Sequence, residues 1–109
     1  MEWAEAKVKT LELWMRIRRM TDEPDELALL TEINAMCDLC NTARDQKPES
    51  LEMCSYCLAY QQFGGCRAVN AEMSELVVTK DWETLRARVD GFIESLKSIE
   101  LPPAGNAAN

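Results

Sequence analysis

The chain has 109 residues, a length that suits a single domain around one hydrophobic core. Hydrophobic residues make up 47% of it, which excludes an intrinsically disordered chain, and only 6% are aromatic, so the expected core is mostly aliphatic. Nineteen acidic and twelve basic side chains give a net charge of −7, which repels phosphate backbones and makes direct nucleic-acid binding unlikely.

Residues 1–10 include two Glu and two Lys and have no continuous apolar run, so no secretory signal is predicted. No segment approaches the roughly 20 apolar residues of a membrane-spanning helix. We therefore expect a cytoplasmic protein, in which clustered cysteines favour metal binding or redox chemistry over structural disulfides. The five cysteines are an odd number, which also argues against a framework made of disulfides alone.

Residues 2–20 are predicted to form the first helix, with a wide apolar arc made of two strips. One strip consists of Val8, Leu11, Trp14 and Met15. The other consists of Ala6, Leu13, Ile17 and Met20. A helix with such an arc either contacts more than one neighbour or uses one strip to dock a partner chain.

A second helix is predicted from residue 24 to residue 41, because Thr21 or Asp22 can cap its start and Pro24 suits a first turn. Its apolar stripe consists of Leu29, Leu30, Ile33, Met36, Cys37 and Cys40. Cys37 and Cys40 are three positions apart, so both are expected on one face near the C-terminal end of this helix.

A third helix is predicted over residues 49–62, because Pro48 suits its start and Gly64-Gly65 allows the left-handed conformation found after a helix end. Residues 66–78 are predicted to be helical as well. Leu76 to Thr79 would also suit a short strand, but the sequence offers no second strand to pair with it.

The last predicted helix covers residues 81–99 and has the clearest apolar stripe of the chain. The stripe consists of Trp82, Leu85, Val89, Phe92, Ile93, Leu96 and Ile99. This three–four spacing is typical of a helix packed along its whole length and, less often, of a homodimer seam, so a homodimer is left open.

Two C-x2-C pairs are the strongest chemical signal in the sequence. Cys37 and Cys40 form the first pair, Cys54 and Cys57 form the second, and thirteen residues separate the pairs. Four thiolates at this spacing are typical of a tetrahedral Zn²⁺ site. If the two helices are antiparallel neighbours, the end of one and the start of the next bring the four sulfurs together. The zinc would then close a helical hairpin, and its role would be structural because four thiolates leave no open position.

Two other interpretations of the cysteines remain open. Cys66 is interpreted as a small buried residue, although it can also replace one ligand or join an iron–sulfur site. The spacing matches neither common ferredoxin pattern, so zinc ranks above an iron–sulfur cluster. Cys54 and Cys57 also suit thiol–disulfide exchange at a helix N-terminus, but no βαβ pattern surrounds them.

The chain has no histidine, which excludes a Ser-His or Cys-His catalytic pair, and no phosphate-binding loop. We predict one all-α domain over residues 1–101, a small bundle of four or five helices with a zinc-closed helical hairpin, and a flexible tail over residues 102–109. The expected function is that of a non-enzymatic zinc-binding adaptor or regulatory protein that acts through protein–protein interaction. The alternatives are an acidic inhibitor that mimics nucleic acid in a partner's basic groove, as a phage-type antagonist would, and a small thiol–disulfide redox or iron–sulfur protein.

Overall fold

The computed structural model describes residues 2–35, 37–46, 57–64 and 67–102, and the structural statements below concern these residues. They form six helices and no strand, which confirms the predicted all-α class for this part of the chain. The helices are α1 (Trp3–Met20), α2 (Glu26–Ile33), α3 (Asp38–Gln46), α4 (Leu58–Phe63), α5 (Arg67–Val78) and α6 (Trp82–Lys97). None of them is both long enough and apolar enough to cross a membrane.

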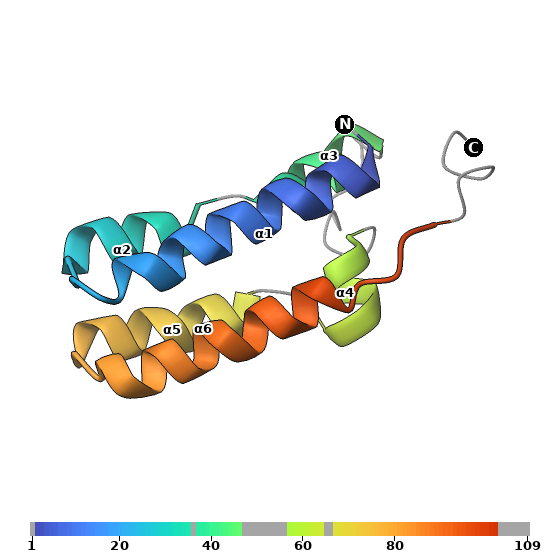
Figure 1. Cartoon of the computed structure of the whole chain (residues 1–109). Coiled ribbons are helices and arrows are strands. Elements are labelled where there is room, and N and C mark those ends of the chain that lie inside the picture. The colour runs from blue at the N-terminus through green and yellow to red at the C-terminus, as the bar shows by residue number, and fades with distance from the viewer. Residues whose placement is uncertain (1, 36, 47–56, 65–66, 103–109) are drawn as a thin grey trace.

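The two longest helices, α1 and α6, lie side by side and run in opposite directions (Figure 1). Helices α2 and α3 follow one another along α1, and α5 lies along α6 (Figure 1). At one end of the molecule α1, α2, α5 and α6 form a closed ring in which each helix contacts two neighbours. We call this four-helix part the bundle end, and we call the opposite part, which contains α3, α4 and the facing turns of α1 and α6, the cysteine end.

The buried face of α1 differs from the predicted one. Its buried residues are Trp3, Ala6, Thr10, Trp14 and Ile17. Val8 and Met15, which were expected on an apolar strip with Trp14, are 54% and 46% exposed. The prediction for these two residues was wrong because the neighbours of α1, namely α2, α3 and α6, cover only one side of a helix that is apolar on more than one side.

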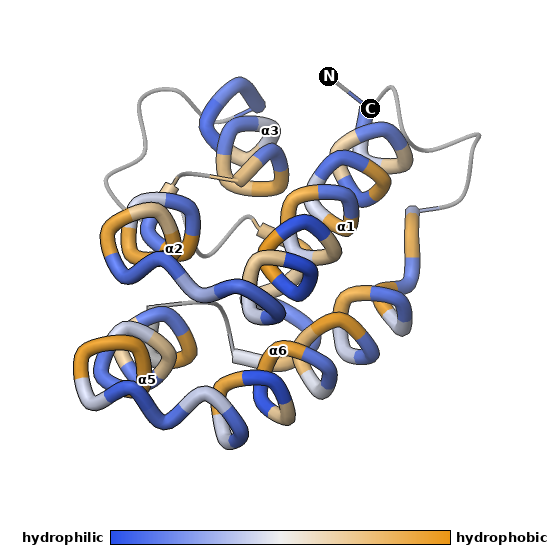
Figure 2. Tube along the Cα trace, turned by 60° about the vertical axis from the view of Figure 1, so that its left-hand side comes forward, coloured by the Kyte–Doolittle hydropathy of each residue, from blue (hydrophilic) through white to orange (hydrophobic). Residues whose placement is uncertain are grey.

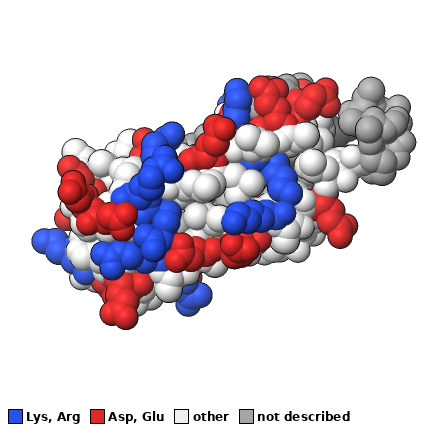
Figure 3. Space-filling model, viewed as in Figure 1, with Lys and Arg blue, Asp and Glu red and all other residues white. Residues whose placement is uncertain are grey.

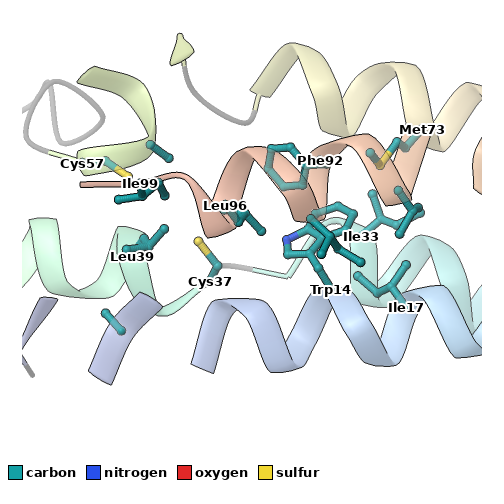
Figure 4. Packing of buried hydrophobic residues seen from close by; sticks show 14 of the residues in the cluster. Trp14, Ile17, Ile33, Cys37, Leu39, Cys57, Met73, Phe92, Leu96 and Ile99 are labelled. Atoms are coloured by element: carbon teal, nitrogen blue, oxygen red, sulfur yellow. The ribbon is translucent and has the colours of Figure 1, made fainter. Parts of the chain in front are cut away.

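The stripe of α6 was predicted correctly. Leu85, Val89, Phe92, Ile93, Leu96 and Ile99 are buried, and Trp82 is partly buried. Phe92 contacts Trp14 of α1 edge-to-face at a ring-centroid distance of 4.7 Å, and it contacts Phe63 at 5.9 Å. These three rings connect α1, α6 and α4 across the middle of the core, where Figure 4 shows Trp14 beside Phe92. Edge-to-face pairs of this kind add to the stabilisation that burial of the rings provides.

The start of the second helix was placed too early. Asp25 caps α2, because its side chain accepts a hydrogen bond from the backbone N–H of Ala28 at 3.0 Å. Thr21 instead ends α1, where its buried hydroxyl donates to the carbonyl of Arg18 at 2.6 Å. Pro24 precedes the cap and is not part of the first turn.

The single helix predicted over residues 24–41 was also wrong, because the structure divides it into α2 and α3. Asn34 ends α2: its side-chain amide donates to the carbonyl of Leu30 at 2.8 Å and to the hydroxyl of Ser74 at 3.0 Å. The first bond satisfies a carbonyl that would otherwise lack a partner at a helix end, and the second ties the break to α5. The chain therefore turns here, and α3 begins at Asp38.

In the second half, most of the predicted boundaries agree with the structure. Gly64 ends α4 in the left-handed conformation, with φ of 89°, as predicted. Helix α5 continues to Val78, so the strand alternative for residues 76–79 was wrong. Asp81 caps α6 by accepting from the backbone N–H of Thr84 at 3.3 Å. The described part of the predicted third helix starts at Leu58, because Cys57 is extended, and residues 49–56 lie outside the described residues.

Two polar side chains hold the last turn of α6 at the cysteine end. Lys7 of α1 donates to the carbonyls of Lys97 and Ile99, each at 2.9 Å. A cation at this position satisfies free carbonyls and suits the negative end of the helix dipole. Gln62 of α4 bonds the backbone of Glu100 in both directions, donating at 2.8 Å and accepting at 2.7 Å. These bonds connect α1 and α4 to the end of α6.

Candidate metal centre

The described cysteines stand at the starts of two helices. The carbonyl of Cys37 accepts the backbone N–H of Asn41 at 3.1 Å, which places Cys37 directly before α3, and Cys40 is in the first turn. Cys57 is the N-cap residue of α4, with an extended backbone. The first pair was predicted near the C-terminal end of a long helix, and this was wrong because Asn34 breaks that helix upstream.

Three of the four predicted ligands come together in the fold. The sulfurs of Cys37 and Cys40 are 3.9 Å apart. The thiol of Cys40 also interacts with Cys57, which is twenty residues after Cys37 in the sequence. Cys37 and Cys57 are buried, and Cys40 is partly exposed. Figure 4 shows Cys57 beside Ile99 and Cys37 near Leu96, so these two thiols occupy positions within the hydrophobic core.

Neighbouring thiols shift the pKa values of Cys40 and Cys57. Hydrogen bonds with Cys37 and Cys57, followed by burial, raise the pKa of Cys40 well above its ordinary value and keep this thiol protonated. The hydrogen bond from Cys40 lowers the pKa of Cys57 to about 7, although burial opposes this change. The backbone N–H groups of Tyr60 and Ala59 also lower it, because the start of α4 favours a negative charge. The arrangement therefore favours one thiolate that accepts from a neighbouring thiol.

The remaining cysteines, Cys54 and Cys66, lie outside the described residues. Within the described part of the chain, no group of three or more His, Cys, Asp or Glu side chains is arranged so that it could hold a metal ion. The structure thus brings Cys37, Cys40 and Cys57 to one end of the molecule, and a four-ligand centre requires Cys54, three positions before Cys57. Asn34 could have indicated the helix break before the first cysteine pair, since Asn often ends helices.

The surface charge is uneven in a way that the overall net charge does not reveal. The face in Figure 3 shows Lys and Arg interspersed with Asp and Glu. Residues 22–34 and 69–81, which contain α2 and most of α5, have eight acidic residues and one basic residue. The rest of the chain has eleven of each, so these two segments account for the whole net charge of −7. The two helices are neighbours, and three of the eight carboxylates, those of Asp22, Glu32 and Glu72, form ion pairs with arginines of α1 and α6.

No protein-family model, curated protein sequence or solved structure matches this chain. The function of this chain is therefore inferred from its cysteine cluster, its helix arrangement and its surface.

Proposed function

We propose that this chain is a non-enzymatic zinc-binding adaptor or regulatory protein, in which Cys37, Cys40, Cys54 and Cys57 hold a structural Zn²⁺. One distance carries the proposal. A tetrahedral centre with Zn–S bonds of about 2.3 Å has sulfurs about 3.8 Å apart. The sulfurs of Cys37 and Cys40 are 3.9 Å apart, so this pair already has the separation of one edge of such a tetrahedron.

The placement of the thiols at helix starts gives independent support. Cys37 precedes α3 and Cys57 precedes α4, so both thiols stand at helix N-termini, and the backbone N–H groups of Ala59 and Tyr60 favour the thiolate of Cys57. Such groups stabilise thiolates, which are the form that binds zinc. A metal there would tie α3 to α4. It would stabilise the cysteine end, where α4 has only six residues and two of the core positions are thiols.

A metal centre with four protein ligands has no open coordination position, and this supports a role as an adaptor rather than as an enzyme. Four thiolates close the coordination sphere, so the metal would shape the fold and activate no water. The exposed surface would then carry the activity through contacts with another protein. Val8, Met15, Leu27, Tyr60, Val78 and Leu101 are the large hydrophobic residues that remain exposed in the described part of the chain.

One observation favours the alternative of an acidic inhibitor: residues 22–34 and 69–81, which contain α2, most of α5 and the turns beside them, have eight acidic residues and one basic residue. A mimic of nucleic acid needs such a concentration of carboxylates to enter a basic groove. The second alternative, a thiol–disulfide redox or iron–sulfur protein, is favoured by the pKa of Cys57 near 7. The burial of Cys57, which is 3% exposed, opposes thiol exchange with another protein.

The proposal is tested by elemental analysis of protein purified under reducing conditions without added metal. We expect one zinc per chain in the native protein and in Cys66→Ser, and clear loss of zinc in Cys40→Ser. The Cys66 variant is a matched control, because it removes a thiol that we do not assign as a ligand. Equal zinc loss in the two variants would show that the ligand set is wrong. A native protein without zinc, or one with a brown chromophore, would contradict the zinc assignment.

A further inference from the structure

We infer that the outer face of α2 and α5 is a docking surface for a basic amphipathic helix of a partner protein. The face includes the exposed residues Leu27, Asn34, Ala71 and Val78 and the partly buried residues Leu30 and Ser74. The inference rests on the proposed function in one respect, because it names the class of partner that an adaptor of this shape would bind. It requires no contribution from the cysteine end.

The face has an apolar centre that the fold leaves uncovered. Leu27 is 76% exposed, more than any other large hydrophobic residue in the described part of the chain, and Val78 is 58% exposed. Leu27, Leu30 and Asn34 are spaced by three and four positions, so they form one stripe on α2. Ala71, Ser74 and Val78 form the matching stripe on α5. Figure 2 shows α2 and α5 next to each other, with hydrophobic stretches on their outer sides.

A hydrogen bond fixes how the two stripes align. The amide of Asn34 donates to the hydroxyl of Ser74 at 3.0 Å. Because α2 and α5 run in opposite directions, one turn back on α2 corresponds to one turn forward on α5 (Figure 1). Leu30 therefore lies level with Val78, and Leu27 lies one turn further along α2. The face extends from Leu27 to Asn34 over about two helical turns, or roughly 10 Å, and its large apolar residues lie in the turn nearer to Leu27, where they suit one or two apolar side chains from one partner helix.

The charge around this apolar centre is negative. Glu23, Glu26 and Glu75 make no ion pair among the described residues, whereas Glu32 and Glu72 are paired with Arg16 and Arg88. Lys80 is the one basic residue of the two segments. An apolar stripe bordered by free carboxylates complements a helix that presents apolar residues at positions i, i+3 or i+4 and i+7, with Lys or Arg beside them.

The same charges argue against the other occupants of this face. A second copy of the chain, related by a two-fold axis, would place this acidic face against itself, and like charges would oppose the contact. A nucleic acid or an anionic membrane would be repelled for the same reason. A basic groove shaped for nucleic acid would gain the charge interaction but would leave Leu27 and Val78 without apolar partners.

The test uses the native, metal-loaded protein and a fluorescein-labelled amphipathic peptide of about 18 Leu and Lys residues, long enough for five helical turns. A peptide with the same leucines and Glu in place of every Lys is the charge control. We expect the Leu–Lys peptide to bind at least about tenfold more tightly than the Leu–Glu peptide. The double variant Leu27→Ser, Val78→Ser should weaken binding of the Leu–Lys peptide by a further tenfold or so, about 1.4 kcal/mol.

The matched control is the double variant Val8→Ser, Met15→Ser, which removes two exposed apolar residues from α1 and should change binding less than about twofold. All four positions are exposed, so circular dichroism should show intact folding in both variants. Equal effects of the two double variants would overturn the inference, as would equal binding of the two peptides. If the native protein self-associates and Leu27→Ser abolishes this self-association, the face binds a second copy of the chain, and the inference is overturned. Zinc is measured in the same samples, so a missing metal would count against the proposed centre without affecting the peptide result.

Discussion

The bundle end and the cysteine end of this molecule are held together by different interactions. At the bundle end, four helices enclose fully buried aliphatic side chains such as Leu29, Met73, Val77 and Leu85. At the cysteine end, two short helices pack on α1 and α6, and the core includes Cys37 and Cys57. Apolar burial can account for the first region without help from a ligand. The second region depends on polar bonds as well and, in our proposal, on a metal.

Removal of the metal should produce the largest difference in stability between the bundle end and the cysteine end. We expect a strong chelator under reducing conditions to lower the thermal midpoint by more than about 10 °C, since a loss of only ~2 kcal/mol produces a shift of that size in a domain of this length. Structural zinc in peptides contributes apparent binding energies of ~10–16 kcal/mol at neutral pH, so the loss can be larger. Hydrogen exchange should show faster exchange at Leu39, Ala43 and Ala59 than at Leu85 and Val89. An unchanged midpoint and unchanged protection at the cysteine end would show that the thiols do not hold a structural metal, and would put the redox alternative first.

Matched core substitutions at the two ends should reveal the same difference in stability, with a smaller effect than removal of the metal. Leu85 at the bundle end and Leu39 at the cysteine end are both 0% exposed. In the metal-loaded protein, Leu85→Ala and Leu39→Ala should each cost ~2–5 kcal/mol in urea unfolding, because each leaves a cavity. After chelation, Leu85→Ala should keep this cost, whereas Leu39→Ala should cost less than about 1 kcal/mol because its surroundings are already loosened. Equal costs in the metal-free protein would mean that the two ends unfold as one unit.

The smallest expected effect is a pH dependence of the metal-free protein. The pKa of Cys57 is lowered from 9.0 to about 7, so the folded state favours the thiolate. The resulting stabilisation is present above pH 9 and is lost as the pH falls through 7. Thiolate absorbance at 240 nm should show a step near pH 7 that is missing in Cys57→Ala, while Cys40 stays protonated through this range. If every described cysteine titrates near pH 9, the three sulfurs do not interact in the way the structure indicates.

The two ends also differ in how far the sequence could predict them. The stripe and the Asp81 cap of α6 were predicted because they depend on spacing along one helix. The end of α2 was not predicted, since Asn34 is held partly by Ser74, forty residues later in the chain. The exposure of Val8 and Met15 was missed because only the positions of neighbouring helices decide which apolar side of α1 is covered. For the candidate centre, the cysteine spacing predicted a cluster of four thiols, of which the structure describes three and brings Cys40 next to Cys37 and Cys57. The spacing did not indicate that these cysteines stand at helix starts.

The bonds from Lys7 to Lys97 and Ile99 have a consequence for how the chain folds during synthesis. They join residues more than ninety positions apart, and the contact of Trp14 with Phe92 also bridges most of the sequence. Helix α1 is synthesised before α6, and the side of α1 that binds α6 has no partner until residues 82–99 have been made. Contacts of such long sequence separation slow folding, because the intervening chain must be closed before they form. The side of α1 that binds α6 should therefore stay open to chaperones until α6 has been made, and the packing of these two helices should be among the last steps in the folding of this domain.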